Sequence, residues 1–152
     1  MTQALVSQLT DDIATIRSWS QGAPGIQVAE VDTINVLIGD GAAVLVPGIA
    51  AALSVDFNAF ITGAYLHEFD GITGSVLVTI DKAAYVVGSA PVFTSIIGSS
   101  PLVLTSARFS ENTLLTGWTQ QINRGDVLRF LVSSATAITR VLVALRIRRL
   151  EP

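Results

Sequence analysis

The sequence contains no cysteine, one histidine and few charged residues, and each shortage removes a class of site. Without cysteine the chain has neither disulfides nor thiolate metal ligands, so assembly in a reducing cytoplasm is compatible with its composition. His67 is the only histidine, which excludes a metal centre built from several imidazoles. We therefore expect neither a metal nor another cofactor.

Long hydrophobic runs and clusters of basic residues are also missing. The longest apolar stretch, residues 42–53, is interrupted by Pro47 and is shorter than the ~20 residues that span a bilayer. The first 20 residues lack a basic start followed by an apolar core, so no secretory signal is expected. No lysine or arginine cluster is interleaved with stacking aromatics, which disfavours nucleic-acid binding. We expect neither membrane insertion nor contact with nucleic acid.

Apolar residues are abundant instead. Half of the 152 residues are hydrophobic, only 14% are charged, and the mean hydropathy of +0.58 is high for a soluble monomer of one domain. Subunit interfaces that resemble a core cut in half would account for this excess.

Alternating apolar and polar residues, separated by glycine, proline and asparagine, predict an all-β fold. We expect strands at residues 26–31, 33–38, 42–46, 51–57, 60–68, 74–81, 92–97, 102–105, 127–133 and 141–148. The Gly39-Asp40-Gly41 sequence predicts a hairpin turn, and residues 133–136 predict another turn. Short strands at this spacing are typical of an antiparallel β-sandwich or jelly roll.

The last third of the chain carries the clearest strand pattern. Val141, Val143, Leu145 and Ile147 fall on one face of the final strand and alternate with residues of the other face. The preceding strand is entered through a tight turn, in which we expect Gly125 to adopt a conformation open mainly to glycine. Asp126 is expected to accept hydrogen bonds from nearby backbone groups.

The same region carries a family resemblance. Its motifs are Leu-Thr-Gly-Trp-Thr at 115–119, Gly-Asp-x-Leu-Arg-Phe at 125–130, and Thr-Arg-Val-x-Val-x-Leu at 139–145. Residues 114–148 resemble the C-terminal β-sandwich of small structural proteins of tailed bacteriophages, with a looser echo at 53–57 and 74–82. The resemblance implies a virion component, fibre-like or associated with the head or tail, and often trimeric. The first 50 residues lie outside it.

The N-terminal segment has a helical rather than a β pattern. From residue 2 to 20, apolar residues recur at intervals of three or four and form one stripe: Leu5, Leu9, Ile13, Ile16 and Trp19. Such a short helix must pack on its own body, on symmetry mates in a coiled coil, or on a larger particle. We therefore divide the chain into an assembly anchor, residues 1–25, and a sandwich body, residues 26–152.

Charge is divided unevenly along the chain. Residues 1–81 have a net charge of −8 and residues 82–152 a net charge of +5. Either the two signs meet between subunits and fix their register, or each half simply solvates its own surface.

Candidate chemical groups are few. His67 is interpreted as a surface or interface residue. Asp56, Glu68, Asp70 and Asp81 could act in glycoside hydrolysis only if two of them flanked a groove. Trp118, at the head of a strand, either plugs the core or stacks on a sugar, and the structural interpretation is favoured.

Together these patterns predict a non-enzymatic virion structural protein. It would be a homotrimer assembled in the host cytoplasm, displayed as a short tail-fibre or spike knob or as a capsid decoration protein, and docked on another phage head or tail protein. The alternative is a carbohydrate-binding, lectin-like module that recognises a host-surface glycan. An enzyme is disfavoured.

Overall fold

The computed structural model describes residues 30–150, which form ten β-strands. The strands are β1 (Glu30–Gly39), β2 (Gly48–Ser54), β3 (Asn58–His67), β4 (Ser75–Ala83), β5 (Thr94–Ser95), β6 (Leu102–Thr105), β7 (Phe109–Asn112), β8 (Gln121–Ile122), β9 (Val127–Thr136) and β10 (Arg140–Leu150). The predicted all-β fold is confirmed for this part of the chain. Residues 30–150 contain no helix, and hence none long and apolar enough to cross a membrane.

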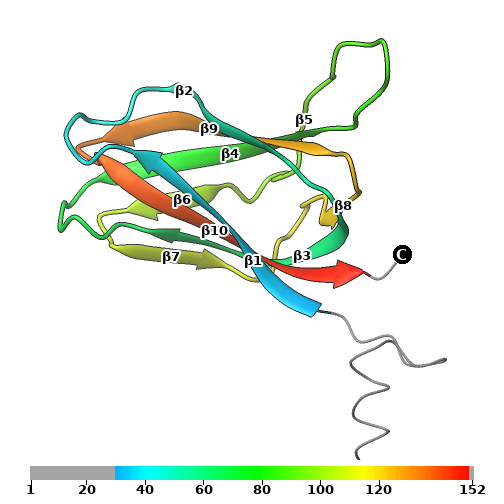
Figure 1. The fold of residues 1–152 in the computed structure, drawn as a ribbon. Coiled ribbons are helices and arrows are strands. Elements are labelled where there is room, and N and C mark those ends of the chain that lie inside the picture. Colours follow the sequence, from blue (N-terminus) through cyan, green and yellow to red (C-terminus); the bar gives the residue numbers. More distant parts are fainter. Residues whose placement is uncertain (1–29, 151–152) are drawn as a thin grey trace, which may run out of the picture.

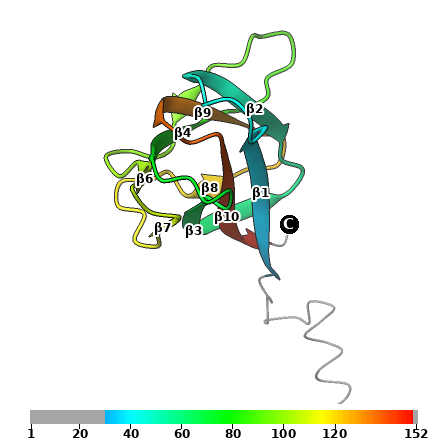
Figure 2. The same cartoon turned by 90° about the vertical axis from the view of Figure 1, so that its left-hand side faces the viewer.

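Two five-stranded antiparallel sheets lie face to face (Figures 1 and 2). Sheet A has the order β1-β10-β3-β7, with β8 also paired to β3, and sheet B has the order β2-β9-β4-β5, with β6 also paired to β4. From β1 to β4 every connection crosses from one sheet to the other, and β9 and β10 again lie in different sheets. This order is that of a jelly roll, in which strands from both halves of the chain interleave.

The connections gather at two ends of the sandwich. The β1–β2, β3–β4, β6–β7 and β9–β10 connections share one end, because Gly39 pairs with Arg140 and His67 pairs with Phe109. The β2–β3, β4–β5 and β8–β9 connections share the other. Glu30 and Leu150, the limits of the described body, lie at this second end, from which the β4–β5 loop projects (Figure 1). We call it the entry end.

The core between the sheets follows the alternation read from the sequence. In β10, Val141, Val143, Leu145 and Ile147 are fully buried, as predicted. Phe130 of β9 is the largest fully buried side chain and comes from the facing sheet. Trp118 is buried as well, and its indole Nε1 donates a hydrogen bond to the carbonyl oxygen of Ser100 at 2.7 Å. This contact agrees with the structural interpretation of Trp118.

The predicted hairpin after β1 is wrong. Residues 42–46 form no strand, and β1 pairs with β10 rather than with the segment that follows it. The carboxylate of Asp40 accepts the N–H groups of Ala42 and Ala43 at 2.8 and 3.2 Å, which curls the chain away from sheet A. Pro47 lacks a donor, so the next strand starts only at Gly48.

Other boundaries also differ from the prediction. β2 covers residues 48–54 rather than 51–57, and only residues 94–95 of the predicted strand 92–97 form a strand, β5. Residue 32 does not break the first strand, which runs continuously through β1. β9 continues to Thr136, so the turn before β10 lies at residues 137–139 rather than 133–136. The two short strands β7 and β8 were not predicted. The predicted helix at residues 2–20 and the first four residues of the predicted strand 26–31 lie outside the described residues.

The acidic first half and the basic second half of the sequence form ion pairs with each other within the sandwich. Four arginines of the second half pair with aspartates of the first half: Arg124 with Asp56, Arg129 with Asp81, Arg140 with Asp70, and Arg149 with Asp32. The interleaved topology places the two halves side by side, so the opposite charges meet inside one chain. Neither of the two alternatives drawn from the sequence describes these pairs.

Candidate binding surface

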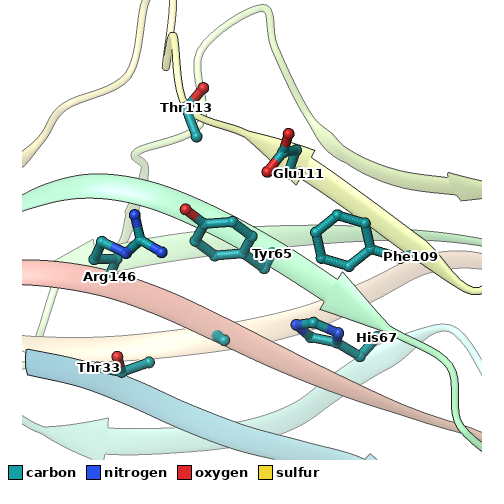
Figure 3. Close-up of a pocket in the computed structure, with 8 residues that line it drawn as sticks. Thr33, Tyr65, His67, Phe109, Glu111, Thr113 and Arg146 are labelled. Atoms are coloured by element: carbon teal, nitrogen blue, oxygen red, sulfur yellow. The ribbon is translucent and has the colours of Figure 1, made fainter.

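An open hollow of about 580 Å³ lies on the outer face of sheet A (Figure 3). Its lining comes from four strands that are far apart in the sequence: Thr33 of β1, Tyr65 and His67 of β3, Phe109 and Glu111 of β7, Ala144 and Arg146 of β10, together with Thr113 just after β7. The sheet order β1-β10-β3-β7 brings them to one surface.

A bulge and two small residues create the depth of the hollow. Gly63 pairs with Arg146 and Ile61 with Ile147, so Thr62 is an extra residue in β3 that shifts the register there. A Cβ atom on Gly63 would lie 3.0 Å from the hydroxyl oxygen of Tyr65, which shows that the Tyr65 ring lies over the glycine. Ala144, paired with Tyr65, adds only a methyl group to the floor.

Three aromatic rings cover one side of the hollow. The ring centroids of Tyr65 and His67 are 6.5 Å apart, and those of Tyr65 and Phe109 are 6.1 Å apart, with ring planes inclined by only 23° and 26°. His67 and Phe109 are 4.9 Å apart and face each other directly in the register of β3 and β7. The rings therefore form a continuous, partly exposed aromatic surface.

Polar groups surround these rings. The guanidinium of Arg146 lies 5.0 Å from the centroid of the Tyr65 ring, a cation–π contact. Figure 3 shows Tyr65 between Arg146 and Phe109, with Glu111 and Thr113 along the β7 side. Within residues 30–150, neither the carboxylate of Glu111 nor the guanidinium of Arg146 forms a hydrogen bond or ion pair. Both remain available to a ligand.

This arrangement suits binding by stacking and hydrogen bonding. The aromatic faces can pack on a flat or ring-shaped molecule, while the arginine, carboxylate and hydroxyl groups can fix its orientation. The described residues contain no group of three or more metal-ligating side chains.

The carboxylates considered for glycoside hydrolysis are occupied elsewhere. Three of them bind an arginine: Asp56 at the entry end, Asp70 at the opposite end, and Asp81 on sheet B. Glu68 is buried, and its carboxylate accepts the backbone N–H groups of residues 70, 71 and 72. None of the four lines the hollow.

Among residues 30–150, the two groups with shifted pKa values lie at the end opposite the entry end. Hydrogen bonds from the backbone N–H groups of Ala42 and Ala43 lower the pKa of Asp40. The hydrogen bond to Asp70 raises the pKa of Arg140. Both groups are tied to loop structure rather than exposed to a cavity, so these shifts indicate fixed connections between strands.

The structure places the predicted turn residues at the entry end. Gly125 has a φ of 92°, and its N–H donates to the carbonyl oxygen of Val55 at 2.7 Å. Asp126 is buried, and its carboxylate accepts the N–H of Asn123 at 2.8 Å. The predicted anchor residues lie outside the described residues: Leu5, Leu9, Ile13, Ile16 and Trp19.

Sequence reasoning missed most of the hollow. Of its lining it singled out only His67, as a surface or interface residue. Neither Tyr65 nor Glu111 gave a usable signal, since the neighbours of Tyr65 in the chain are apolar and Glu111 lies in a strand that was not predicted. Assigning them to one site requires the order of the strands, which no local pattern contains.

Comparisons with known proteins give little further information. No family model and no curated protein match the chain. Among solved structures, the chain is similar to one described as "Structure of infectious bursal disease virus Gx strain", with a TM-score of 0.35 and 9% sequence identity. That similarity covers 81% of this chain and 40% of that chain, so this chain spans about two fifths of the viral chain's length. Function must therefore be inferred from the surface of this chain.

Proposed function

We propose that this chain is a non-enzymatic structural protein of a tailed-bacteriophage virion. In this proposal it forms a homotrimer that is displayed as a short fibre or spike knob or as a capsid decoration protein, after assembly in the host cytoplasm. The observation that carries the proposal is the pair of exposed apolar segments that border sheet B. The resemblance of residues 114–148 to phage structural proteins supports the assignment to a virion.

The exposed apolar residues are concentrated rather than scattered. Seven of the twelve large hydrophobic side chains exposed between residues 31 and 150 lie in two segments that border sheet B. They are Val44, Val46 and Ile49 in the β1–β2 region, and Tyr85, Val86, Val87 and Val92 in the β4–β5 loop. Val87 is 83% exposed and Val92 is 78% exposed. The first segment adjoins the end opposite the entry end and the second projects from the entry end, so they form two separate apolar patches. Exposed apolar patches mark interaction surfaces.

The outer face of sheet B is suited to being covered. Its centre carries Arg129 and Asp81, whose side chains are 2.7 Å apart, and the Arg129 guanidinium lies 4.0 Å from the centre of the Phe93 ring. Leu131 continues the face beside this pair. The two charges pair with each other, but the Nε of Arg129 is buried without a hydrogen-bond partner among the described residues. A second copy could cover the face without leaving either charge unpaired, and an acceptor on that copy could satisfy the Arg129 Nε.

The fold agrees with the proposal without deciding it. Jelly rolls occur in viral capsid proteins and also in lectins, and a fold by itself does not define a function. Carbohydrate binding at a host surface is therefore a second candidate. It is favoured by the aromatic surface of Tyr65, His67 and Phe109 on the opposite sheet.

Sedimentation of the intact protein at micromolar concentration tests the oligomeric state. We expect a trimer, and we expect Val87→Asp combined with Val92→Asp to weaken it while the β-sheet circular dichroism is retained. Leu114→Asp is the matched control, because Leu114 is 87% exposed but lies outside both segments. A stable wild-type monomer would contradict the proposal, as would absence of the protein from purified particles by immunogold labelling.

A further inference from the structure

We propose that the hollow on sheet A is a binding site for an acidic saccharide. A sugar ring would stack on the aromatic surface of Tyr65 and Phe109. Its carboxylate would bind Arg146, and its hydroxyl groups would bind Glu111 and Thr113. The site is independent of the oligomeric state and of the assignment to a virion, since every group that forms it belongs to one chain.

The aromatic surface supplies the contact for the ring. Sugar rings present C–H groups on their faces, and these pack on the faces of aromatic side chains. Tyr65 is fixed for this role from below by Gly63 and from the side by Arg146. Phe109 is 47% exposed although its ring packs against two other rings. The exposure leaves an open face beside Tyr65.

An unpaired carboxylate distinguishes this surface from the rest of the body. Among the carboxylates between residues 31 and 150, the other seven each bind an arginine, a lysine or backbone N–H groups. Glu111 alone has no such partner in that range. A lone carboxylate beside aromatic rings is a suitable acceptor for sugar hydroxyl groups, because it can accept two hydrogen bonds.

The cationic side of the hollow favours an acidic sugar over a neutral one. Arg146 lines the hollow, and Arg148, at the next outward position of β10, lies beyond its lining; both lack a carboxylate partner among the described residues. Their cross-strand neighbours are Thr33 and Gly63 for Arg146, and Val31 and Phe60 for Arg148. None of these neighbours is acidic. The planar fork of a free guanidinium binds a carboxylate through two parallel hydrogen bonds.

The position of the hollow is compatible with access to a ligand. The cross-strand pair of His67 and Phe109, which borders the hollow, lies toward the end opposite the entry end. The apolar β4–β5 loop projects from the entry end (Figure 1). The hollow also opens on sheet A, whereas most of the exposed apolar side chains border sheet B. A trimer formed through sheet B would leave the hollow open.

The test begins with an array of uronate- and sialate-containing oligosaccharides and neutral oligosaccharides, probed with the intact protein. Acidic members that bind are then titrated by calorimetry against the wild type, Tyr65→Ala and Arg146→Ala. We expect each substitution to weaken binding by at least about tenfold, and we expect Arg146→Lys to restore part of the loss. Binding should also weaken as salt rises, because it includes an ion pair.

The matched controls are Tyr85→Ala and Arg124→Ala, which remove an exposed tyrosine and an exposed arginine outside the hollow. Both should bind like the wild type. Three results would overturn the proposal. The wild type could bind no oligosaccharide more tightly than Tyr65→Ala does, or it could bind neutral and acidic oligosaccharides equally, with no effect of Arg146→Ala. The third result is a folded Tyr65→Ala protein whose sedimentation coefficient differs from that of the wild type. The last result would identify the hollow as a subunit interface.

Discussion

Asp126 and Lys82 connect the β8–β9 turn to sheet B at the entry end, with 3.6 Å between the Asp126 carboxylate and the Lys82 ammonium. The Asp126 side chain is only 4% exposed, and it also accepts the N–H of Asn123. The Lys82 ammonium donates a hydrogen bond to the carbonyl oxygen of Gln121 at 2.7 Å. The turn is therefore held by a buried carboxylate with two partners.

The first prediction is that Asp126→Ala destabilises the fold by roughly 2–4 kcal/mol, because it removes a buried acceptor and leaves Lys82 without its charge partner. Asp126→Asn should lose less, since its amide oxygen can still accept the Asn123 N–H. Chemical denaturation at fixed protein concentration measures both. The control is Asp56→Ala, whose 86% exposed side chain pairs with Arg124 and should contribute little. Equal losses at positions 126 and 56 would contradict the interpretation.

The second prediction concerns the neighbouring glycine. Gly125 has a φ of 92°, and a Cβ atom added to it would meet no atom within 4 Å beyond its chain neighbours. A substitution there therefore meets backbone strain rather than a clash, and Gly125→Val should lower stability by ~1–3 kcal/mol. Gly125→Asn should lose less, because asparagine tolerates positive φ better than other non-glycine residues. An unchanged melting temperature for Gly125→Val would show that the turn does not need glycine.

Most long strands could be predicted from the sequence because their inward residues keep a strict period of two. β10 is the clearest case, with Val141 and its alternate neighbours buried as expected. β7 was missed because its four residues, Phe-Ser-Glu-Asn, place their one large apolar side chain outward. The β1–β2 connection was misjudged because glycines around Asp40 are typical of hairpins, whereas here the Asp40 side chain organises a crossover.

The candidate site could not be predicted for a different reason. Thr33, Tyr65, Glu111 and Arg146 are separated by at least 30 residues from one another in the sequence, and only the sheet order makes them neighbours. The bulge at Thr62 also reverses which residues of β3 face outward, so alternation counted from Ile61 would place Tyr65 in the core. The site depends on that one extra residue.

The third prediction is a pH dependence at Asp40. Its pKa is lowered by the N–H groups of Ala42 and Ala43, so the folded-state pKa lies below the unfolded one. The stabilisation is therefore complete above the unfolded pKa of roughly 3.9 and is lost as pH falls through the folded value. The difference in melting temperature between wild type and Asp40→Ala should shrink toward zero at the acid end. If the difference in melting temperature stays constant across the acid range, ionisation of the Asp40 carboxylate is not the source of that difference.

The described residues form one buried core, whose extent bears on the role of the N-terminal segment. The buried cluster between the sheets extends from Val36 to Ile147, with Ile34 packed at its edge. Among the described residues, those that belong to this buried cluster or pack against it all lie at position 34 or later. β1 also begins at the entry end, on the same side as the apolar β4–β5 loop (Figure 1). A segment that leads into β1 is thus placed to attach the body through that end.

The last prediction is that residues 1–25 act as an assembly anchor, through the apolar stripe that the sequence predicts on a helix. Removing them should leave a folded, β-rich trimer, because the buried cluster of the described residues begins at position 34, but the truncated protein should no longer join the particle. Leu9→Asp combined with Ile13→Asp should reproduce the loss in the full chain, whereas Gln3→Asp on the polar side should not. Circular dichroism, sedimentation and particle incorporation measure these effects. Unfolding of the truncated protein would assign the segment to the core, and normal incorporation would show that the sandwich itself makes the attachment.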